Sequence, residues 1–196
     1  MAAIAELTLD EVRLVYRTYI VRDFPRSERK PLSRIEAGLR RGEYRCLGMK
    51  DGGEVLAYAF LVTLNRDGKR LCLFEYLAVR QELRGQGIGS LFLDELGKTL
   101  AVQQDCVLLE VEDPDAAPDE AERQVRTRRL HFYLKNGLRD TGARSLVFGV
   151  HYSILEIPTA AAHSALETRE IYQALYRSFL PALVFAARVK MTGRAE

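Results

Sequence analysis

The sequence has no tryptophan, only three cysteines and three histidines among 196 residues, and no long hydrophobic run. The longest uncharged apolar stretch, Phe179–Ala187, is far shorter than the ~20 residues of a membrane-spanning helix. Residues 1–20 lack a basic start followed by an apolar core, so we expect no signal peptide. The widely spaced thiols predict reduced core cysteines, no metal site and a cytoplasmic location; they are Cys46, Cys72 and Cys106.

The chain also lacks a large excess of positive or negative charge. The chain has 29 basic and 27 acidic residues, a formal net charge of +2, which gives no reason to expect nucleic-acid binding. Its composition is 47% hydrophobic and 29% charged, as in ordinary globular proteins, which excludes collagen-like, disordered and coiled-coil classes. The length predicts one domain at roughly 100–200 residues per domain, with room for a terminal appendage.

Local patterns in the first half predict two helices and then antiparallel strands. Thr8 and Glu11 form a capping box, and apolar residues at helical spacing follow to about Val21. A short helix is expected at Ser33–Arg41. Asp51-Gly52-Gly53 is typical of a hairpin turn. The predicted strands are Tyr44–Met49, Glu54–Leu64 and Leu71–Val79, and the middle one is apolar enough to be covered on both faces.

The second half alternates strands and helices. We expect strands at Cys106–Val111, Leu138–Thr141 and Leu146–Leu155, with helices at about Gly87–Leu100 and up to Asn136-Gly137. A capping box at Ser164 and Glu167 begins a last helix, which ends before Pro181. The pattern does not decide between helix and strand for the last fifteen residues. It predicts an α/β fold with a single mixed, mostly antiparallel twisted sheet flanked by helices.

A run of alternating glycines, Arg84-Gly85-Gln86-Gly87-Ile88-Gly89, lies between a predicted strand and a predicted helix. Uncovered amides at a helix N-terminus attract anions, so the run predicts a phosphate or pyrophosphate site. A Walker-type loop would need Lys after the glycines. A dinucleotide fingerprint would need glycine at Ser90 and a parallel βαβ opening. The sequence therefore departs from both nucleotide-binding motifs.

The glycine run resembles motif A of the GNAT superfamily of acyl-CoA-dependent N-acyltransferases, whose signature is Arg/Gln-x-x-Gly-x-Gly/Ala. A second segment, Arg129–Leu138, is similar to motif B of that family and contains Tyr133. The resemblance covers about residues 5–155. It implies a GNAT-like acetyltransferase domain at residues 1–157, and residues 158–196 are then a C-terminal helical extension packed on that domain.

The resemblance also implies a role for each matching segment. Amides of the glycine-rich turn would hold the CoA pyrophosphate, and the end of the preceding strand would pair with the pantetheine arm. Tyr133 would donate a proton to the leaving thiolate, because a phenol of pKa ~10 stays protonated at neutral pH. The expected cofactor-binding residues are Leu77, Ala78, Val79, Arg84, Gly85, Gln86, Gly87, Ile88, Gly89, Ser90, Arg126 and Arg129.

A carboxylate is expected to deprotonate the incoming amine, because removing a proton from an alkylammonium of pKa ~10.4 costs about 4.6 kcal/mol at pH 7. Glu75 is the first candidate, since it shares a strand face with Leu77 and Val79. Glu110 and Glu112 on the next strand are the alternatives.

The chain departs from the family pattern where many members have Asn and Ala seven and four positions before the tyrosine. Here these positions hold Arg126 and Arg129, which would contact CoA phosphates, bind an acidic substrate, or form a solvated helix face.

The activity that the resemblance implies is transfer of an acetyl group from acetyl-CoA to a small-molecule or peptide amine in a ternary complex. The protein would be a monomer or homodimer without nucleic-acid or membrane partners. The alternative is a non-catalytic acyl-CoA-binding module.

Overall fold

The computed structural model describes residues 3–192, which form a mixed α/β structure with one eight-stranded, mostly antiparallel sheet. The strands follow the order β1-β2-β3-β4-β5-β7-β6-β8. The predicted fold class is therefore confirmed. Contacts along the chain divide it into two units: the first unit comprises residues up to Thr63 with Phe74–Leu96, and the second comprises Leu64–Leu73 with the chain from Gly97 onward.

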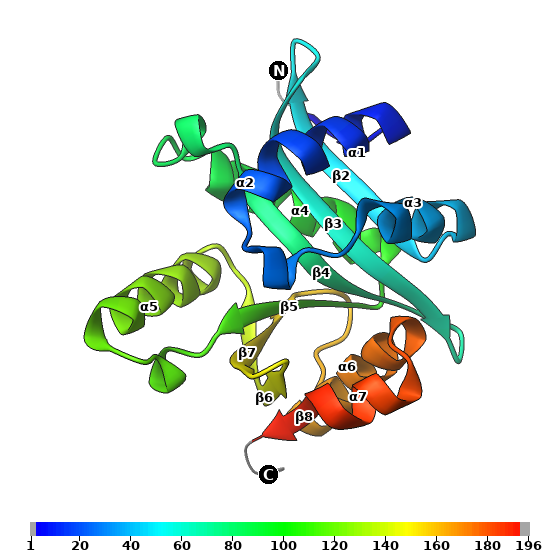
Figure 1. Ribbon diagram of the computed structural model, residues 1–196, viewed down its shortest axis with the longest axis vertical. Coiled ribbons are helices and arrows are strands. Elements are labelled where there is room, and N and C mark those ends of the chain that lie inside the picture. The colour runs from blue at the N-terminus through cyan, green and yellow to red at the C-terminus, as the bar shows by residue number, and fades with distance from the viewer. Residues whose placement is uncertain (1–2, 193–196) are drawn as a thin grey trace. The chain divides into compact units, whose positions relative to one another are not determined.

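The first unit is an antiparallel set of strands with helices on both faces. Figure 1 shows α1 and α3 in front of these strands and α4 behind them. β1 pairs with β2, and β2 pairs with β3 around the predicted Asp51-Gly52-Gly53 turn. Its elements are β1 (Ala3–Glu6), α1 (Leu9–Val15), α2 (Val21–Asp23), α3 (Leu32–Arg41), β2 (Tyr44–Asp51), β3 (Glu54–Arg66), β4 (Lys69–Val79) and α4 (Ile88–Gln103), of which the last three continue into the second unit.

The helix predicted from Thr8 to Val21 forms, with one irregularity. The Thr8 hydroxyl accepts from the Glu11 N–H, and the Glu11 carboxylate accepts from the Thr8 N–H, so the capping box is confirmed. Residues Tyr16–Ile20 then form a π-helical turn before α2. A π-turn widens the helix locally by one residue, and periodicity gives no warning of it.

The second unit contains strands that the sequence located only in part. β6 (Arg139–Val147) and β7 (Val150–Ile157) are antiparallel and turn at Phe148-Gly149. The predicted strands Leu138–Thr141 and Leu146–Leu155 were therefore wrong in their bounds, because the second one runs through this turn. Phe148 takes a positive φ of 49°, which is rare for an aromatic residue and conceals the turn in an apolar run.

The remaining elements of this unit are β5 (Cys106–Glu112), α5 (Glu120–Lys135), α6 (Ala165–Phe179), α7 (Ala182–Arg188) and β8 (Val189–Thr192). The Ser164 capping box opens α6 as predicted, and Pro181 separates α6 from α7. The last fifteen residues, left open by the sequence, hold a helix and a short strand that pairs with β6; residues 193–196 lie outside the described range.

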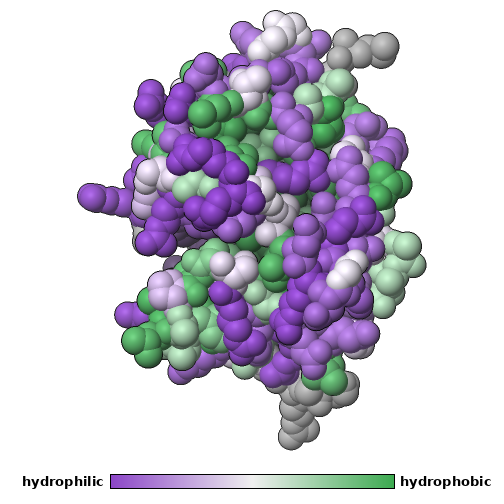
Figure 2. Space-filling model, turned by 90° about the vertical axis from the view of Figure 1, so that its right-hand side faces the viewer, coloured by the Kyte–Doolittle hydropathy of each residue, from purple (hydrophilic) through white to green (hydrophobic). Residues whose placement is uncertain are grey.

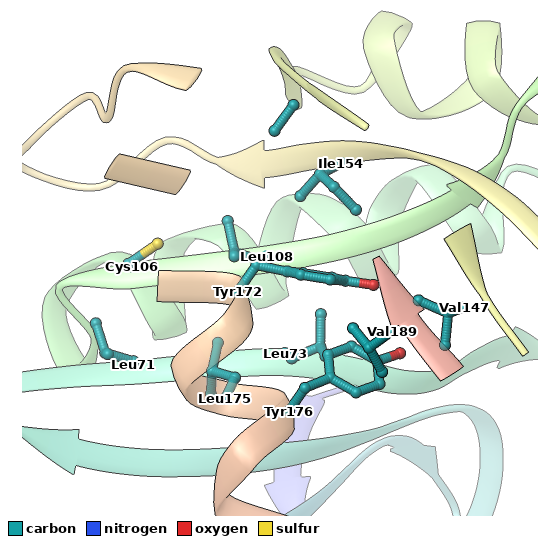
Figure 3. Close-up of a cluster of buried hydrophobic side chains, with 11 residues drawn as sticks. Leu71, Leu73, Cys106, Leu108, Val147, Ile154, Tyr172, Leu175, Tyr176 and Val189 are labelled. Carbon is teal, nitrogen blue, oxygen red and sulfur yellow. The ribbon is translucent and has the colours of Figure 1, made fainter. Parts of the chain in front are cut away.

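A hydrophobic cluster fills the second unit between the sheet and α6. Figure 3 shows Leu108 of β5, Leu73 of β4 and the two tyrosines of α6 directed toward one another. Cys46, Cys72 and Cys106 are buried free thiols, as predicted. On the face shown in Figure 2, hydrophilic residues predominate and hydrophobic ones are interspersed. Among residues 3–192, no helix is both long and apolar enough to cross a bilayer.

Two leucine substitutions test this core. Leu108 is 0% exposed, whereas Leu183 in α7 is 86% exposed. We expect Leu108→Ala to lower the free energy of unfolding by about 2–5 kcal/mol, because it removes buried contacts and leaves a cavity. Leu183→Ala, the same chemical change, is expected to cost less than about 0.5 kcal/mol. Urea denaturation measures both, and equal effects would contradict the assignment of the core.

Candidate functional site

The glycine-rich turn connects β4 to α4 through two left-handed residues. After a 3₁₀ turn at Gln81–Leu83, Gly85 and Gly87 have φ values of +78° and +81°. Nothing lies within 4 Å of the position that a Cβ would occupy at either glycine. The turn leads directly into α4, and the first amides of a helix have no acceptor inside the helix. The turn therefore fits a bound phosphate or pyrophosphate.

Arg84 stands beside the turn and is tied back to the protein. Its guanidinium donates to the carbonyl of Val79 at 3.1 Å and forms an ion pair with Asp23 of α2 at 3.1 Å. Its N–H donates to the carbonyl of Gln81. Of the amides expected to bind phosphate, that of Arg84 is consequently already engaged, which leaves the amides from Gly85 onward.

Glu75, the first candidate for the base, lies on β4 two residues before Leu77. Its side chain is 20% exposed and forms an ion pair with the ammonium of Lys30 at 2.6 Å. The hydroxyl of Tyr44 on β2 donates to the same carboxylate. Burial and the Glu75 charge raise the pKa of Tyr44 well above its ordinary value, so Tyr44 is a donor at all physiological pH values. Glu75 and the glycine-rich turn thus both belong to the first unit.

Tyr133, the expected proton donor, is on α5 in the second unit and is half-buried. Burial raises the pKa of its phenol above the ordinary value of 10.0, and the nearby Arg129 guanidinium partly offsets the rise. Among residues 3–192, its hydroxyl has no hydrogen-bond partner. Tyr133 is therefore a protonated phenol that is available to a ligand.

Arg126 and Arg129 both point at β5. Arg126 forms an ion pair with Glu112 at 3.3 Å and with Glu122 at 3.0 Å, and Arg129 forms one with Glu112 at 2.5 Å. Glu112, an alternative base, is thus held between two guanidiniums. Both oxygens of this carboxylate are therefore already engaged by cations of the protein.

The other alternative base, Glu110, is also engaged. Its carboxylate accepts hydrogen bonds from Tyr172 and Tyr176 of α6, and Tyr172 also contacts the hydroxyl of Ser145 at 3.0 Å. Burial and the Glu110 charge raise the pKa of both tyrosines well above the ordinary value. This arrangement ties α6 to the sheet, and sequence reasoning missed it because its partners are more than sixty residues apart.

A buried polar group involving cysteine and histidine was also missed. Cys106, Glu156 and His163 place their metal-ligating atoms within 4.8 Å of one another. Glu156, however, is already bound by the guanidinium of Arg139, which also donates to the carbonyl of His163 at 2.7 Å, and by the His163 imidazole. These contacts compensate the charge of the carboxylate without a metal ion. The group is therefore best explained as a salt bridge that fixes the segment after β7.

Comparison with known proteins places these features in a family. Residues 42–139 match the family model described as an acetyltransferase (GNAT) domain, which spans the glycine-rich turn and Tyr133. No curated protein matches the chain.

Among solved structures, the chain is similar to a protein from Bacteroides thetaiotaomicron assigned to the GNAT family, with 19% identity over 92% of this chain and 97% of the other, at a TM-score of 0.65. It is also similar to the ribosomal-protein-S18-alanine N-acetyltransferase from Escherichia coli, with 19% identity over 83% and 97% and a TM-score of 0.58. A spermidine N-acetyltransferase variant from Vibrio cholerae has 13% identity over 80% and 92% and a TM-score of 0.58. At these identities the likeness concerns the fold.

The ionisation of Tyr133 tests its environment. The absorbance titration of the wild type minus that of Tyr133→Phe isolates this phenol, and we expect a midpoint above the ordinary value of 10.0 because burial disfavours the phenolate. A raised folded-state pKa contributes stability that is present below the unfolded value and is lost as pH rises through the folded one. Ionisation at or below the ordinary value would contradict the buried position.

Proposed function

The chain belongs to the GNAT family of acetyltransferases, and on this premise we propose that it transfers the acetyl group of acetyl-CoA to a primary amine. The observation that carries the proposal is the turn at Gly85 and Gly87, where left-handed backbone with open space at both Cβ positions leads into the N-terminus of α4. A helix N-terminus attracts a compact negative charge, and the CoA pyrophosphate has this chemistry.

The binding roles are assigned to the glycine-rich turn, the end of β4 and two arginines of α5. The amides of Gly85, Gln86, Gly87, Ile88, Gly89 and Ser90 would hold the pyrophosphate, with Arg84 beside it. The backbone at Leu77, Ala78 and Val79 would pair with the pantetheine arm. Arg126 and Arg129 would contact a CoA phosphate while sharing their charge with Glu112.

The chemical roles fall to Glu75 and Tyr133. We propose that Glu75 accepts the proton of the incoming ammonium, directly or through a water, since Glu112 is held by two arginines and Glu110 by two tyrosines. The neutral amine attacks the thioester carbonyl, the C–N bond forms, and the C–S bond breaks. Tyr133 then protonates or hydrogen-bonds the leaving thiolate, whose ordinary pKa is ~8.5 as a thiol.

We infer the organisation of the chain from the same premise. Residues 1–157 would form the acetyltransferase domain, with 158–196 as an extension packed on it. The acceptor would be a small-molecule or peptide amine, and the protein would act in the cytoplasm as a monomer or homodimer, without metal.

Calorimetric titration with acetyl-CoA tests the binding proposal. We expect the wild type to bind acetyl-CoA and CoA, and Gly87→Glu to weaken binding by at least about tenfold, or 1.4 kcal/mol, because a side chain and a negative charge enter the phosphate space. Gly53→Glu is the matched control. Gly53 also has a positive φ, +87°, and nothing within 4 Å of its Cβ position, but it lies in the β2–β3 turn.

Three results would contradict this proposal: no binding of either CoA compound, equal binding by Gly87→Glu, or binding of ATP that excludes CoA. Acetyl-CoA binding without turnover on a broad panel of amines would support the alternative, a non-catalytic acyl-CoA-binding module.

Removal of the Tyr133 hydroxyl tests the chemical step. With an amine identified from the panel, we expect Tyr133→Phe to lower kcat by about 10²-fold, the lower range for general acid catalysis, with little change in the Kd of acetyl-CoA. The phenol has no hydrogen-bond partner among the described residues, so its loss should leave the fold intact. An unchanged kcat would show that the thiolate leaves without Tyr133.

A further inference from the structure

Lys30 places a primary amine on the carboxylate proposed as the catalytic base. Its Nζ lies 2.6 Å from Oε1 of Glu75 and 5.2 Å from the ring centroid of Tyr44, whose hydroxyl donates to the same carboxylate. An alkylammonium acceptor would be recognised by these same features: a carboxylate to receive its proton and an aromatic face to stabilise its charge. Lys30 therefore occupies the position expected for the amine of the acceptor.

The backbone holds Lys30 there. Its N–H donates to the Tyr76 hydroxyl at 2.7 Å, and its carbonyl accepts from the Tyr16 hydroxyl at 2.8 Å. Tyr76 in turn donates to the carbonyl of Glu28 at 3.1 Å, so two tyrosines clamp the connection between α2 and α3. Burial raises the pKa of Tyr76, which keeps this clamp protonated. These contacts fix the backbone of Lys30, from which its side chain reaches Glu75 and the ring of Tyr44.

All of these groups belong to the first unit, as does the glycine-rich turn. Glu75 and Leu77 point to the same face of β4, about 7 Å apart by strand geometry. If the pantetheine arm pairs with Leu77–Val79, the thioester carbonyl ends near Glu75. An amine already hydrogen-bonded to Glu75 then needs little movement to attack.

We propose that Lys30 is a self-acetylation site, an inference that rests on the proposed function. The Nζ proton passes to Glu75, the neutral amine attacks the carbonyl carbon of acetyl-CoA, the C–N bond forms, and the C–S bond breaks. The products are Nε-acetyl-Lys30, CoA as its thiol and one proton. The acetylated side chain is neutral, so its ion pair with Glu75 is lost, and the carboxylate becomes available to an external ammonium.

Lys50 provides an internal control. Its ammonium forms an ion pair with Glu11, and the side chains of this pair are 27% and 21% exposed, against 18% and 20% for Lys30 and Glu75. Chemical acetylation by a reactive thioester should therefore favour Lys50 slightly. Only a bound acetyl donor would reverse the order.

The experiment incubates the full chain with acetyl-CoA and no amine, and follows acetylation of Lys30 and Lys50 by peptide mapping in a mass spectrometer. Acetic anhydride on a parallel sample gives the intrinsic reactivity of each lysine. After this normalisation we expect Lys30 to react at least about tenfold faster than Lys50, because it is oriented toward the donor. The rate per molecule should not depend on protein concentration, and Gly87→Glu should abolish the preference.

Lys30→Arg keeps the cation and the contact with Glu75 but cannot be acetylated in this way, so it should remove this acetyl group alone. Equal normalised rates for Lys30 and Lys50 in a protein that binds acetyl-CoA would overturn the inference and leave the proposed function standing. A rate that grows with protein concentration would overturn it as well, since transfer would be between molecules. Failure of acetyl-CoA to bind would instead overturn the proposed function.

Discussion

Left-handed backbone at Gly85 and Gly87 is the constraint around which the first unit is organised. A residue with a Cβ is strained at φ values of +78° and +81°, and a side chain there would also occupy space that is open at both glycines. The turn therefore exposes donors that a regular strand-to-helix connection would cover. Arg84 stabilises the turn from outside by its contacts with Val79 and Asp23, so the open side remains free of protein side chains.

The three candidate bases differ more clearly in the groups that contact their carboxylates than in their positions on the strands. Glu112 is held by two guanidiniums and Glu110 by two phenols, and both kinds of partner are fixed parts of the second unit. The partner of Glu75 is different, because an ammonium on a flexible side chain can be exchanged for another ammonium. A carboxylate whose cationic partner can be exchanged for a substrate ammonium suits proton transfer from an amine.

Features set by neighbouring residues could be predicted from the sequence, and features set by distant ones could not. Both capping boxes and the Gly52-Gly53 turn depend on residues three or fewer positions apart, and all were confirmed. The β6–β7 turn was misplaced because Phe148 adopts a conformation that its residue type disfavours. Lys30 and Glu75 are 45 positions apart in the sequence. Only the fold therefore reveals that the expected base already forms an ion pair with an amine of the chain.

The residues after β7 supply more than a cover for the sheet. Tyr172 and Tyr176 of α6 lie in the hydrophobic cluster of the second unit and also donate to Glu110. A carboxylate on a strand of this cluster would be costly to bury without donors, by about 1–3 kcal/mol or more for a charged group. β5 and α6 are consequently interdependent. The helix buries its aromatic rings on the sheet, and the hydroxyls of these tyrosines donate hydrogen bonds to Glu110 of β5. Removal of α6 would thus expose the apolar surface of the cluster and take both tyrosine donors away from Glu110.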